Sequence, residues 1–192
     1  MRRIIWSMSV SLDGYMEGPD HDISWSVIDD ELHQHFNDWL GPASAFLTGR
    51  TTYELMDAYW PTADQEPDAS PIIVEFADIW RTTPKVVYSR TLDEVGDNAA
   101  LKREVDPDAV LALKEQGGGD MSVGGARLGS EFLRLGLVDE IRVYVHPVVI
   151  GRGTPMFQPK DVTMSVDLEP TRTFGSGVVL LQYRTTPRPP DE

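Results

Sequence analysis

Three short segments carry glycine, arginine or hydroxyl side chains, and each follows a run of apolar residues. They are Thr48-Gly49-Arg50-Thr51-Thr52, Ser89-Arg90 and Gly124-Gly125-Ala126-Arg127-Leu128-Gly129. Glycine lets the backbone approach a ligand closely, and the free N–H groups of a helix N-terminus attract anions. The forked guanidinium of arginine suits phosphate. Together the three segments predict a site for the phosphate groups of a nucleotide.

Each segment alone also allows a plainer interpretation. The first fits a helix start with an exposed arginine, and the second fits a solvated turn. The third resembles the dinucleotide fingerprint, with Ala126 in place of its second glycine. However, it comes late in the chain, and no acidic partner for a ribose follows about 20 residues on. A Rossmann assignment is therefore disfavoured, while a diphosphate resting on the amides of this helix start remains the expectation.

Strands and helices that alternate along the chain must position these segments. Strands are expected over residues 4–10, 45–47, 85–88, 121–123 and 139–149, with a closing antiparallel pair over 165–168 and 178–184. Helices are expected over 29–40, from a cap at Thr51 or Thr52 to Pro61, and over 71–80, 108–116 and 126–135, with a surface loop over 62–70. This order predicts an α/β fold with a mixed, mostly parallel sheet.

Composition favours one globular domain over residues 1–186, followed by a Pro-rich, charged and flexible tail over 187–192. The absence of cysteine excludes disulfides and thiolate nucleophiles, and a net charge of −14 argues against binding to nucleic acid. The sequence lacks a signal peptide and any apolar run of about 18–20 residues, which predicts a cytoplasmic protein without a membrane partner. His33 and His35 would point different ways on a helix, so no metal site is expected.

Seven segments, in chain order, resemble the dihydrofolate reductase superfamily, and specifically the bacterial relatives of the reductase domain of riboflavin biosynthesis. They are Ser11-Leu12-Asp13-Gly14, Trp25, Gly49-Arg50-Thr51-Thr52-Tyr53-Glu54, Tyr88-Ser89-Arg90, Val123-Gly124-Gly125, Gly136-Leu137-Val138-Asp139-Glu140 and His146-Pro147-Val148-Val149-Ile150-Gly151-Arg152-Gly153. The resemblance covers nearly the whole chain. Its last two segments favour the riboflavin branch.

This resemblance implies a three-layer fold, with helices on both faces of the central sheet and NADPH lying across the strand ends. The Gly-Arg-Thr loop and the Ser-Arg pair would hold the adenosine phosphate end, the Gly-Gly turn the diphosphate, and residues 10–14 the nicotinamide. The implied cofactor-binding residues are Val10, Asp13, Gly14, Gly49, Arg50, Thr51, Thr52, Ser89, Arg90, Gly124, Gly125, Ala126, Arg127 and Leu128. A homodimer that pairs through 139–149 and 151–157 is also implied.

Reduction of a C=N or C=O bond requires a proton as well as a hydride. In folate reductases a carboxylate five residues after a tryptophan serves this end. Counting from Trp25, this is Asp30, although Asp29 and Glu31 leave the register open. Acidic residues at a helix N-terminus also stabilise the helix dipole without any catalytic role. Trp25 is expected to stack on the flat ring of the substrate.

The sequence thus predicts an NADPH-dependent reductase of a small pteridine- or pyrimidine-like heterocycle. A second interpretation is dihydrofolate reductase itself, which is disfavoured because Ser24 precedes Trp25 where the folate enzymes have proline. A third is a protein without turnover, which binds a nucleotide or carries a degenerate site on the same fold.

Overall fold

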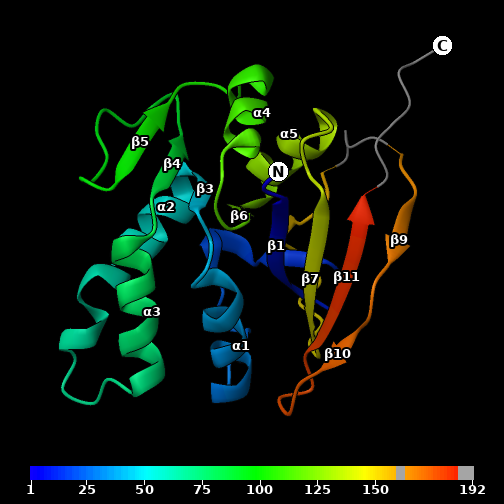
Figure 1. The fold of residues 1–192 in the computed structure, drawn as a ribbon. Coiled ribbons are helices and arrows are strands. Elements are labelled where there is room, and N and C mark those ends of the chain that lie inside the picture. Colours follow the sequence, from blue (N-terminus) through cyan, green and yellow to red (C-terminus); the bar gives the residue numbers. More distant parts are fainter. Residues whose placement is uncertain (159–162, 186–192) are drawn as a thin grey trace.

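A nine-stranded sheet forms the centre of the protein in a computed structural model that describes residues 1–158 and 163–185 (Figure 1). The expected tail over 187–192 lies outside the described residues. The strands of the large sheet are β1 (Ile4–Ser11), β3 (Ala45–Gly49), β4 (Lys85–Tyr88), β5 (Ala99–Lys102), β6 (Met121–Gly124), β7 (Glu140–His146), β9 (Val166–Leu168), β10 (Arg172–Thr173) and β11 (Val179–Thr185). A second, small sheet pairs β2 (Tyr15–Glu17) with β8 (Thr154–Pro155).

The helices are α1 (Asp30–Leu40), α2 (Arg50–Asp57), α3 (Pro71–Thr82), α4 (Pro107–Glu115) and α5 (Ala126–Arg134), with short 3-10 turns η1 (Pro19–His21) and η2 (Trp60–Gln65). Within the two described ranges, no helix is long and apolar enough to cross a membrane.

The strand order is β10-β11-β7-β1-β6-β3-β4-β5. All neighbours from β7 to β5 are parallel, whereas β11 runs antiparallel to β7 and also pairs with β9 and β10. The prediction of a mixed, mostly parallel sheet with an antiparallel C-terminal strand pair is confirmed. β1 lies in the interior of this sheet, between β7 and β6. The loops that follow these neighbouring strands therefore flank its carboxyl end.

The two faces of the sheet bury different helices because side chains alternate along each strand. In β3, Leu47 packs with Trp6 and with residues of α4 and α5, whereas Phe46 packs with residues of α2 and α3. A third cluster places α1 against β7 and β11 through Leu32 and Tyr144. Helices α1, α2 and α3 thus cover one face and α4 and α5 the other, which confirms the three-layer expectation.

Several local expectations differ from the structure: α2 ends at Asp57 rather than near Pro61, and β7 ends at His146 rather than at residue 149. The N-cap of α2 is Gly49 without a side-chain hydrogen bond, so neither Thr51 nor Thr52 is the cap. The reason is that β3 runs directly into α2 and makes Arg50 the first helical residue. Part of the expected loop over 62–70 is the 3-10 turn η2, which Pro61 favours by fixing its φ angle.

Lys85 of β4 is a buried lysine on the face that α3 covers. It is 5% exposed, and its ammonium lies 4.6 Å from the centre of the Trp80 ring. The ammonium donates hydrogen bonds to the backbone carbonyls of Trp80 and Thr83. Burial lowers the pKa of Lys85 to about 8. Because the unfolded chain then binds more protons above that pH, Lys85 makes stability increase with rising pH.

We expect the free energy of unfolding to rise between about pH 8 and pH 10.5 more steeply than in Lys85→Met. The difference should be about 2 kcal/mol across this interval, measured by urea denaturation at each pH. Methionine keeps an apolar stem but does not titrate. Tyr88, whose pKa burial raises to about 12, is present in both proteins and cancels in the comparison. If the free energy of unfolding changed with pH in the same way in both proteins, the lowered pKa of Lys85 would be contradicted.

Candidate functional site

The connections that follow the neighbouring strands β1 and β6 leave the sheet in opposite directions. The two strands are parallel neighbours, paired from Ile4 with Met121 to Trp6 with Val123. After β1 the chain leads to α1 on one face of the sheet, and after β6 it leads to α5 on the other. Adjacent parallel strands whose connections leave to opposite faces form the crevice in which α/β proteins bind ligands.

The Gly124–Gly125 turn links β6 to α5 at this switch point of the sheet. Gly125 is the N-cap of α5 with φ 96° and ψ 142°, a backbone conformation that side chains strongly disfavour. A Cβ atom at Gly125 would lie 2.9 Å from Thr52 Oγ1, so the start of α2 is packed directly on the turn. The first-turn N–H groups of α5 have no acceptor in a preceding helical turn. The turn is therefore shaped like a cradle for an anionic group.

Gly129, the last glycine of the same motif, has a packing role. A Cβ atom there would approach three atoms of the Trp6 ring closer than 3.0 Å. Glycine therefore lets α5 lie directly on the indole of β1, and this contact sets the position of the α5 N-terminus.

The other two predicted loops lie along the same sheet edge. The β3–β6 register pairs Thr48 with Gly124, and the β3–β4 register pairs Gly49 with Tyr88. Since neighbouring strands lie about 4.8 Å apart, the turn after β6 and the pair after β4 are roughly 10 Å apart along the edge. The structure thus brings together the three segments that the sequence singled out.

The arginines at this edge differ in their partners. Arg50 forms an exposed ion pair with Glu54, at 3.3 Å between guanidinium and carboxylate. Arg90 and Arg127 are exposed, and neither forms a hydrogen bond or ion pair with any residue in the described ranges. In a protein of net charge −14, arginines without carboxylate partners are the groups best suited to attract a phosphate.

Ser89 has a structural role, and its expected contact with a phosphate stays a prediction. Its hydroxyl is buried and accepts hydrogen bonds from the backbone N–H groups of Thr91 and Leu92, at 3.2 and 3.0 Å. The hydroxyl therefore stabilises the turn after β4, and the turn presents Arg90.

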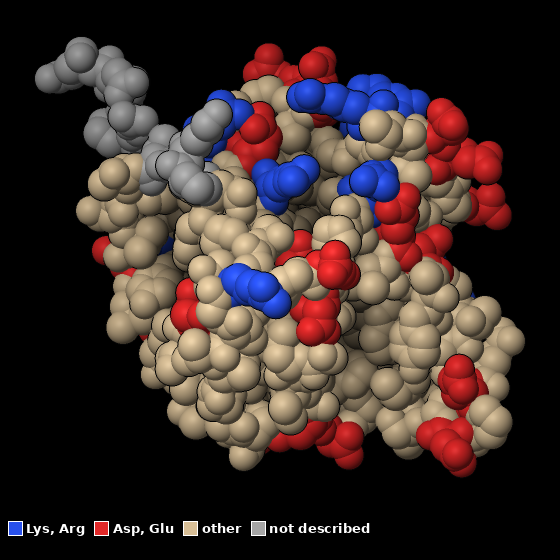
Figure 2. All heavy atoms as spheres, turned by 180° about the vertical axis from the view of Figure 1, so that it is seen from behind, with Lys and Arg blue, Asp and Glu red and all other residues tan. Residues whose placement is uncertain are grey.

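Sequence reasoning missed Lys102 and Arg103. Strand β5 pairs with β4 and places Lys102 opposite Tyr88, while Arg103 donates to the backbone carbonyl of Ser89 at 3.1 Å. The four residues of β5 are too few to give a clear strand signal, although their alternating burial is typical of one. Figure 2 shows Lys and Arg side chains gathered on the upper part of the back face, above a hollowed region.

The loop after β1 is fastened to the segment after β7. The carboxylate of Asp13 accepts hydrogen bonds from the backbone N–H groups of Ile150 and Gly151, at 3.2 and 2.7 Å. The Ser11 hydroxyl and these amides hold the pKa of Asp13 below its usual value. Gly14 turns with φ 88°, and Val10 points into the core. The role of residues 10–14 beside a nicotinamide stays a prediction, because Asp13 is engaged in shaping the loop.

Of the three acidic residues at the start of α1, Asp30 alone forms no hydrogen bond or ion pair with the described residues, although its charge acts on the nearby His33. Asp29 caps the helix by accepting from the Leu32 N–H, and Glu31 binds the Gly175 N–H and Arg172, which lower its pKa. Asp30 is the first helical residue and is exposed. It is therefore the carboxylate still available for proton transfer, and its catalytic role stays a prediction.

Trp25 covers the carboxyl end of β7. Its ring meets the ring of His146 edge to face at 5.4 Å, and its indole N–H donates to the Asp22 carbonyl. His146 is 1% exposed, accepts from the Val27 N–H at 3.3 Å, and has its pKa lowered by burial. Stacking of Trp25 on a substrate ring is untested by this geometry.

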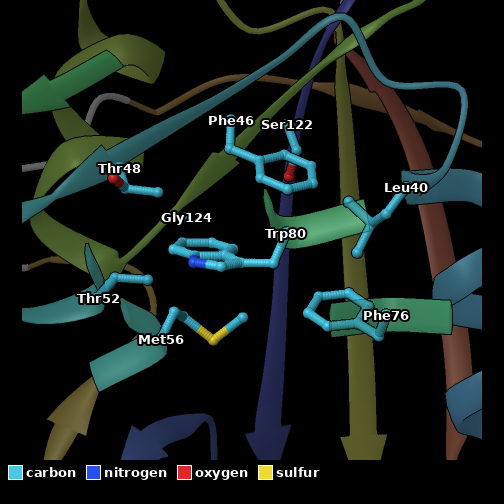
Figure 3. A pocket seen from close by; sticks show the side chains of 9 residues that line it. All are labelled: Leu40, Phe46, Thr48, Thr52, Met56, Phe76, Trp80, Ser122 and Gly124. Atoms are coloured by element: carbon cyan, nitrogen blue, oxygen red, sulfur yellow. The ribbon is translucent and has the colours of Figure 1, made fainter. Parts of the chain in front are cut away.

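A cavity of about 100 Å³ lies beneath α1, α2 and α3, on the face of β3 and β6 (Figure 3). Its lining residues are Leu40, Phe46, Thr48, Thr52, Met56, Phe76, Trp80, Ser122 and Gly124. Neither Asp30 nor Trp25 is among them. Across residues 1–158 and 163–185, no group of three or more His, Asp or Glu side chains is placed to hold a metal ion.

The comparisons with known proteins agree with this geometry. A model of the RibD C-terminal domain family matches residues 2–180. The uncharacterized protein YyaP of Bacillus subtilis (strain 168) is 35% identical over 186 residues, which are 95% of this chain and 94% of YyaP.

Two solved structures share the fold. A Shewanella sp. PV-4 protein assigned to riboflavin biosynthesis superposes with a TM-score of 0.74 at 19% identity, covering 96% of this chain and 99% of that chain. The Thermotoga maritima diaminohydroxyphosphoribosylaminopyrimidine deaminase/5-amino-6-(5-phosphoribosylamino)uracil reductase superposes with a TM-score of 0.65 at 18% identity. Here 96% of this chain matches 57% of that longer chain.

Proposed function

Because this chain belongs to the family of RibD C-terminal domains, we propose that it is an NADPH-dependent reductase of a small pyrimidine- or pteridine-like heterocycle. One observation carries the proposal: the Gly124–Gly125 turn, the start of α2 and Arg90 meet along one sheet edge beside the switch point. The spacing of these parts suits a dinucleotide laid across strand ends.

The residues present fit the proposed cofactor. At Gly125 a Cβ atom would occupy the space between the turn and Thr52, so glycine keeps that space open. The N-terminal amides of α5 suit a diphosphate. Arg90, supported by the neighbouring Lys102 and Arg103, would hold the 2′-phosphate that distinguishes NADPH from NADH. Arg50 and Thr51, at the start of α2, would contact the same adenosine end.

Bound NADPH would supply the hydride, and the chain must orient the acceptor and deliver a proton. Asp30 would supply that proton, directly or through a water, since its carboxyl is not engaged by the fold. The Thermotoga maritima neighbour is by name a uracil reductase, which supports a pyrimidine-like acceptor for this chain.

We expect Arg90→Ala to bind NADPH about tenfold more weakly while its affinity for NADH is unchanged. The reason is that the guanidinium would contact only the 2′-phosphate. Fluorescence titration of both nucleotides with wild type and variant measures this. Arg134→Ala is the matched control, because Arg134 is an exposed arginine at the far end of α5 that pairs with Glu131.

Two outcomes would count against the proposal. Failure of wild type to bind either nucleotide at millimolar concentration would remove the cofactor and with it the reductase. Tight NADPH binding without oxidation by any pyrimidine or pterin would instead favour a nucleotide-binding protein without turnover.

A further inference from the structure

His146, at the end of β7, is a buried histidine with one ring nitrogen unused. Its Nδ1 atom accepts a hydrogen bond from the Val27 N–H at 3.3 Å. Because a backbone N–H can only donate, Nδ1 carries no proton, and the proton of the neutral ring is on Nε2. Burial lowers the pKa of His146, which keeps the ring neutral at pH 7. The Nε2 atom is buried and has no hydrogen-bond partner in the part of the chain that the structure describes.

An unused N–H donor at a buried position is costly to the fold. The His146 side chain is 1% exposed, so its Nε2–H group has given up water without gaining a protein acceptor. The Trp25 ring meets the imidazole edge to face at 5.4 Å, and an aromatic ring is only a weak acceptor for an N–H group. A ligand that brings an oxygen or nitrogen atom to Nε2 would remove this cost.

His146 joins the two segments to which the proposed function assigns the nicotinamide and the proton. The β1–β7 register pairs it with Ser11, and neighbouring strands lie about 4.8 Å apart, so residues 10–14 pass beside it. Its bond to Val27 holds the segment that leads into α1, and Asp30 follows within a reach of at most about 11 Å. An acceptor that receives both hydride and proton would therefore lie against His146.

We propose that His146 is a catalytic residue, which donates a hydrogen bond from Nε2 to the carbonyl oxygen or imine nitrogen of the acceptor. This role rests on the proposed function, because it requires an acceptor that is reduced. Hydride addition to the carbon of a C=O or C=N bond moves the electron pair of that bond to the oxygen or nitrogen. A neutral imidazole N–H aimed at this atom stabilises the developing negative charge and keeps its own proton. Asp30 would then supply the proton that completes the reduction.

Trp25 must move before a ligand can reach Nε2, and the hydrogen bonds around it are local. Its indole N–H donates to the carbonyl of Asp22, three residues earlier. The Ser26 N–H and hydroxyl both donate to the carbonyl of Ile23, again three residues earlier. The indole can therefore swing away together with its own anchor, while the sheet beneath keeps its pairing.

NMR of the full, nitrogen-15-labelled chain tests the contact. In the free protein at pH 7 we expect His146 to carry its proton on Nε2. Uracil, cytosine or pterin is then added to protein saturated with NADP+, which prevents turnover, and should move the His146 Nε2–H signal downfield. The exposed His21 ring, which pairs with Glu17, is the internal control and should not change. A His146 signal that none of these probes moves would overturn the proposal.

Two substitutions separate the donor from the packing of the ring. His146→Gln keeps an N–H group near the place of Nε2, whereas His146→Leu fills a similar volume and donates nothing. Calorimetric titration with the probe that moves the NMR signal should show about tenfold weaker binding in His146→Leu, and a loss of no more than about threefold in His146→Gln. Both variants should keep the wild-type affinity for NADPH, because His146 is proposed to touch only the acceptor.

Thermal unfolding distinguishes a role in binding from a role in folding. His146→Leu removes the unused donor, and Val27, which loses its acceptor, is exposed and can bond to water. The variant should therefore unfold at or above the wild-type temperature while its affinity for the probe falls. A lower melting temperature with unchanged probe affinity would show that His146 serves only the fold.

Steady-state oxidation of NADPH by the same probe tests the catalytic step. We expect kcat to fall about a hundredfold in His146→Leu, the usual effect of losing one donor at a developing charge, and to recover in part in His146→Gln. Equal kcat in His146→Leu and wild type would overturn the catalytic role.

NADPH titrations of the wild type distinguish failure of this inference from failure of the proposed function. NADPH binding without any probe at Nε2 would overturn the role of His146 alone. Probe contact at Nε2 without NADPH binding would remove the reductase and the catalytic role with it, and would leave His146 as a donor that binds a ligand.

Discussion

Gly125→Ala should lower the affinity for NADPH about a hundredfold, the largest effect on binding that we expect from a single methyl group. At φ 96° and ψ 142° a side chain strains the backbone by about 1–3 kcal/mol. The new Cβ would also lie 2.9 Å from Thr52 Oγ1, against the start of α2. The turn must therefore move away from α2, and its amides would no longer converge on one phosphate.

Gly136→Ala is the control that separates the effect of backbone strain from the effect of displacing the Gly124–Gly125 turn. Gly136 also has a positive φ, 68°, but a Cβ atom there meets nothing within 4 Å. This control should lose about 1 kcal/mol of stability and keep its NADPH affinity. Fluorescence titration and thermal unfolding of both variants make the comparison. Equal NADPH affinity in Gly125→Ala and wild type would show that the turn does not hold the cofactor.

Gly129→Ala should destabilise the protein by about 3 kcal/mol, which is roughly 6–12 °C in melting temperature for a chain of this size. The added methyl group would collide with the Trp6 indole, which is itself fully buried between β1 and α5. Relief requires α5 to move away from the sheet, because neither the strand nor the ring has free space.

The control for this variant is Gly117→Ala, whose Cβ would meet nothing within 4 Å at an ordinary φ angle. Calorimetry should show Gly117→Ala unfolding within a few degrees of wild type. Since α5 carries the turn proposed to hold the diphosphate, Gly129→Ala should also weaken NADPH binding at temperatures where it stays folded. Wild-type stability of Gly129→Ala would mean that α5 packs elsewhere.

Local sequence patterns predicted the mixed, mostly parallel sheet and the three loops, whereas the three layers were implied by the family resemblance. Apolar runs that end in Gly49-Arg50, Ser89-Arg90 and Gly124-Gly125 are local signals, because a glycine or a polar residue interrupts the apolar run within a few residues. They located the carboxyl ends of β3, β4 and β6 within two residues of where the structure has them.

Other features were decided only by the tertiary structure, because they depend on residues far apart in the chain. β5 is too short to be recognised alone and exists through its pairing with β4, which brings Lys102 and Arg103 to Arg90. The hydroxyl of Ser89 accepts hydrogen bonds from the amides of Thr91 and Leu92, a contact that depends on how the turn after β4 folds. The cavity joins side chains from three helices and two strands, and no pattern within one segment encodes such a meeting. Local periodicity sets the elements, whereas packing among them creates the cavity.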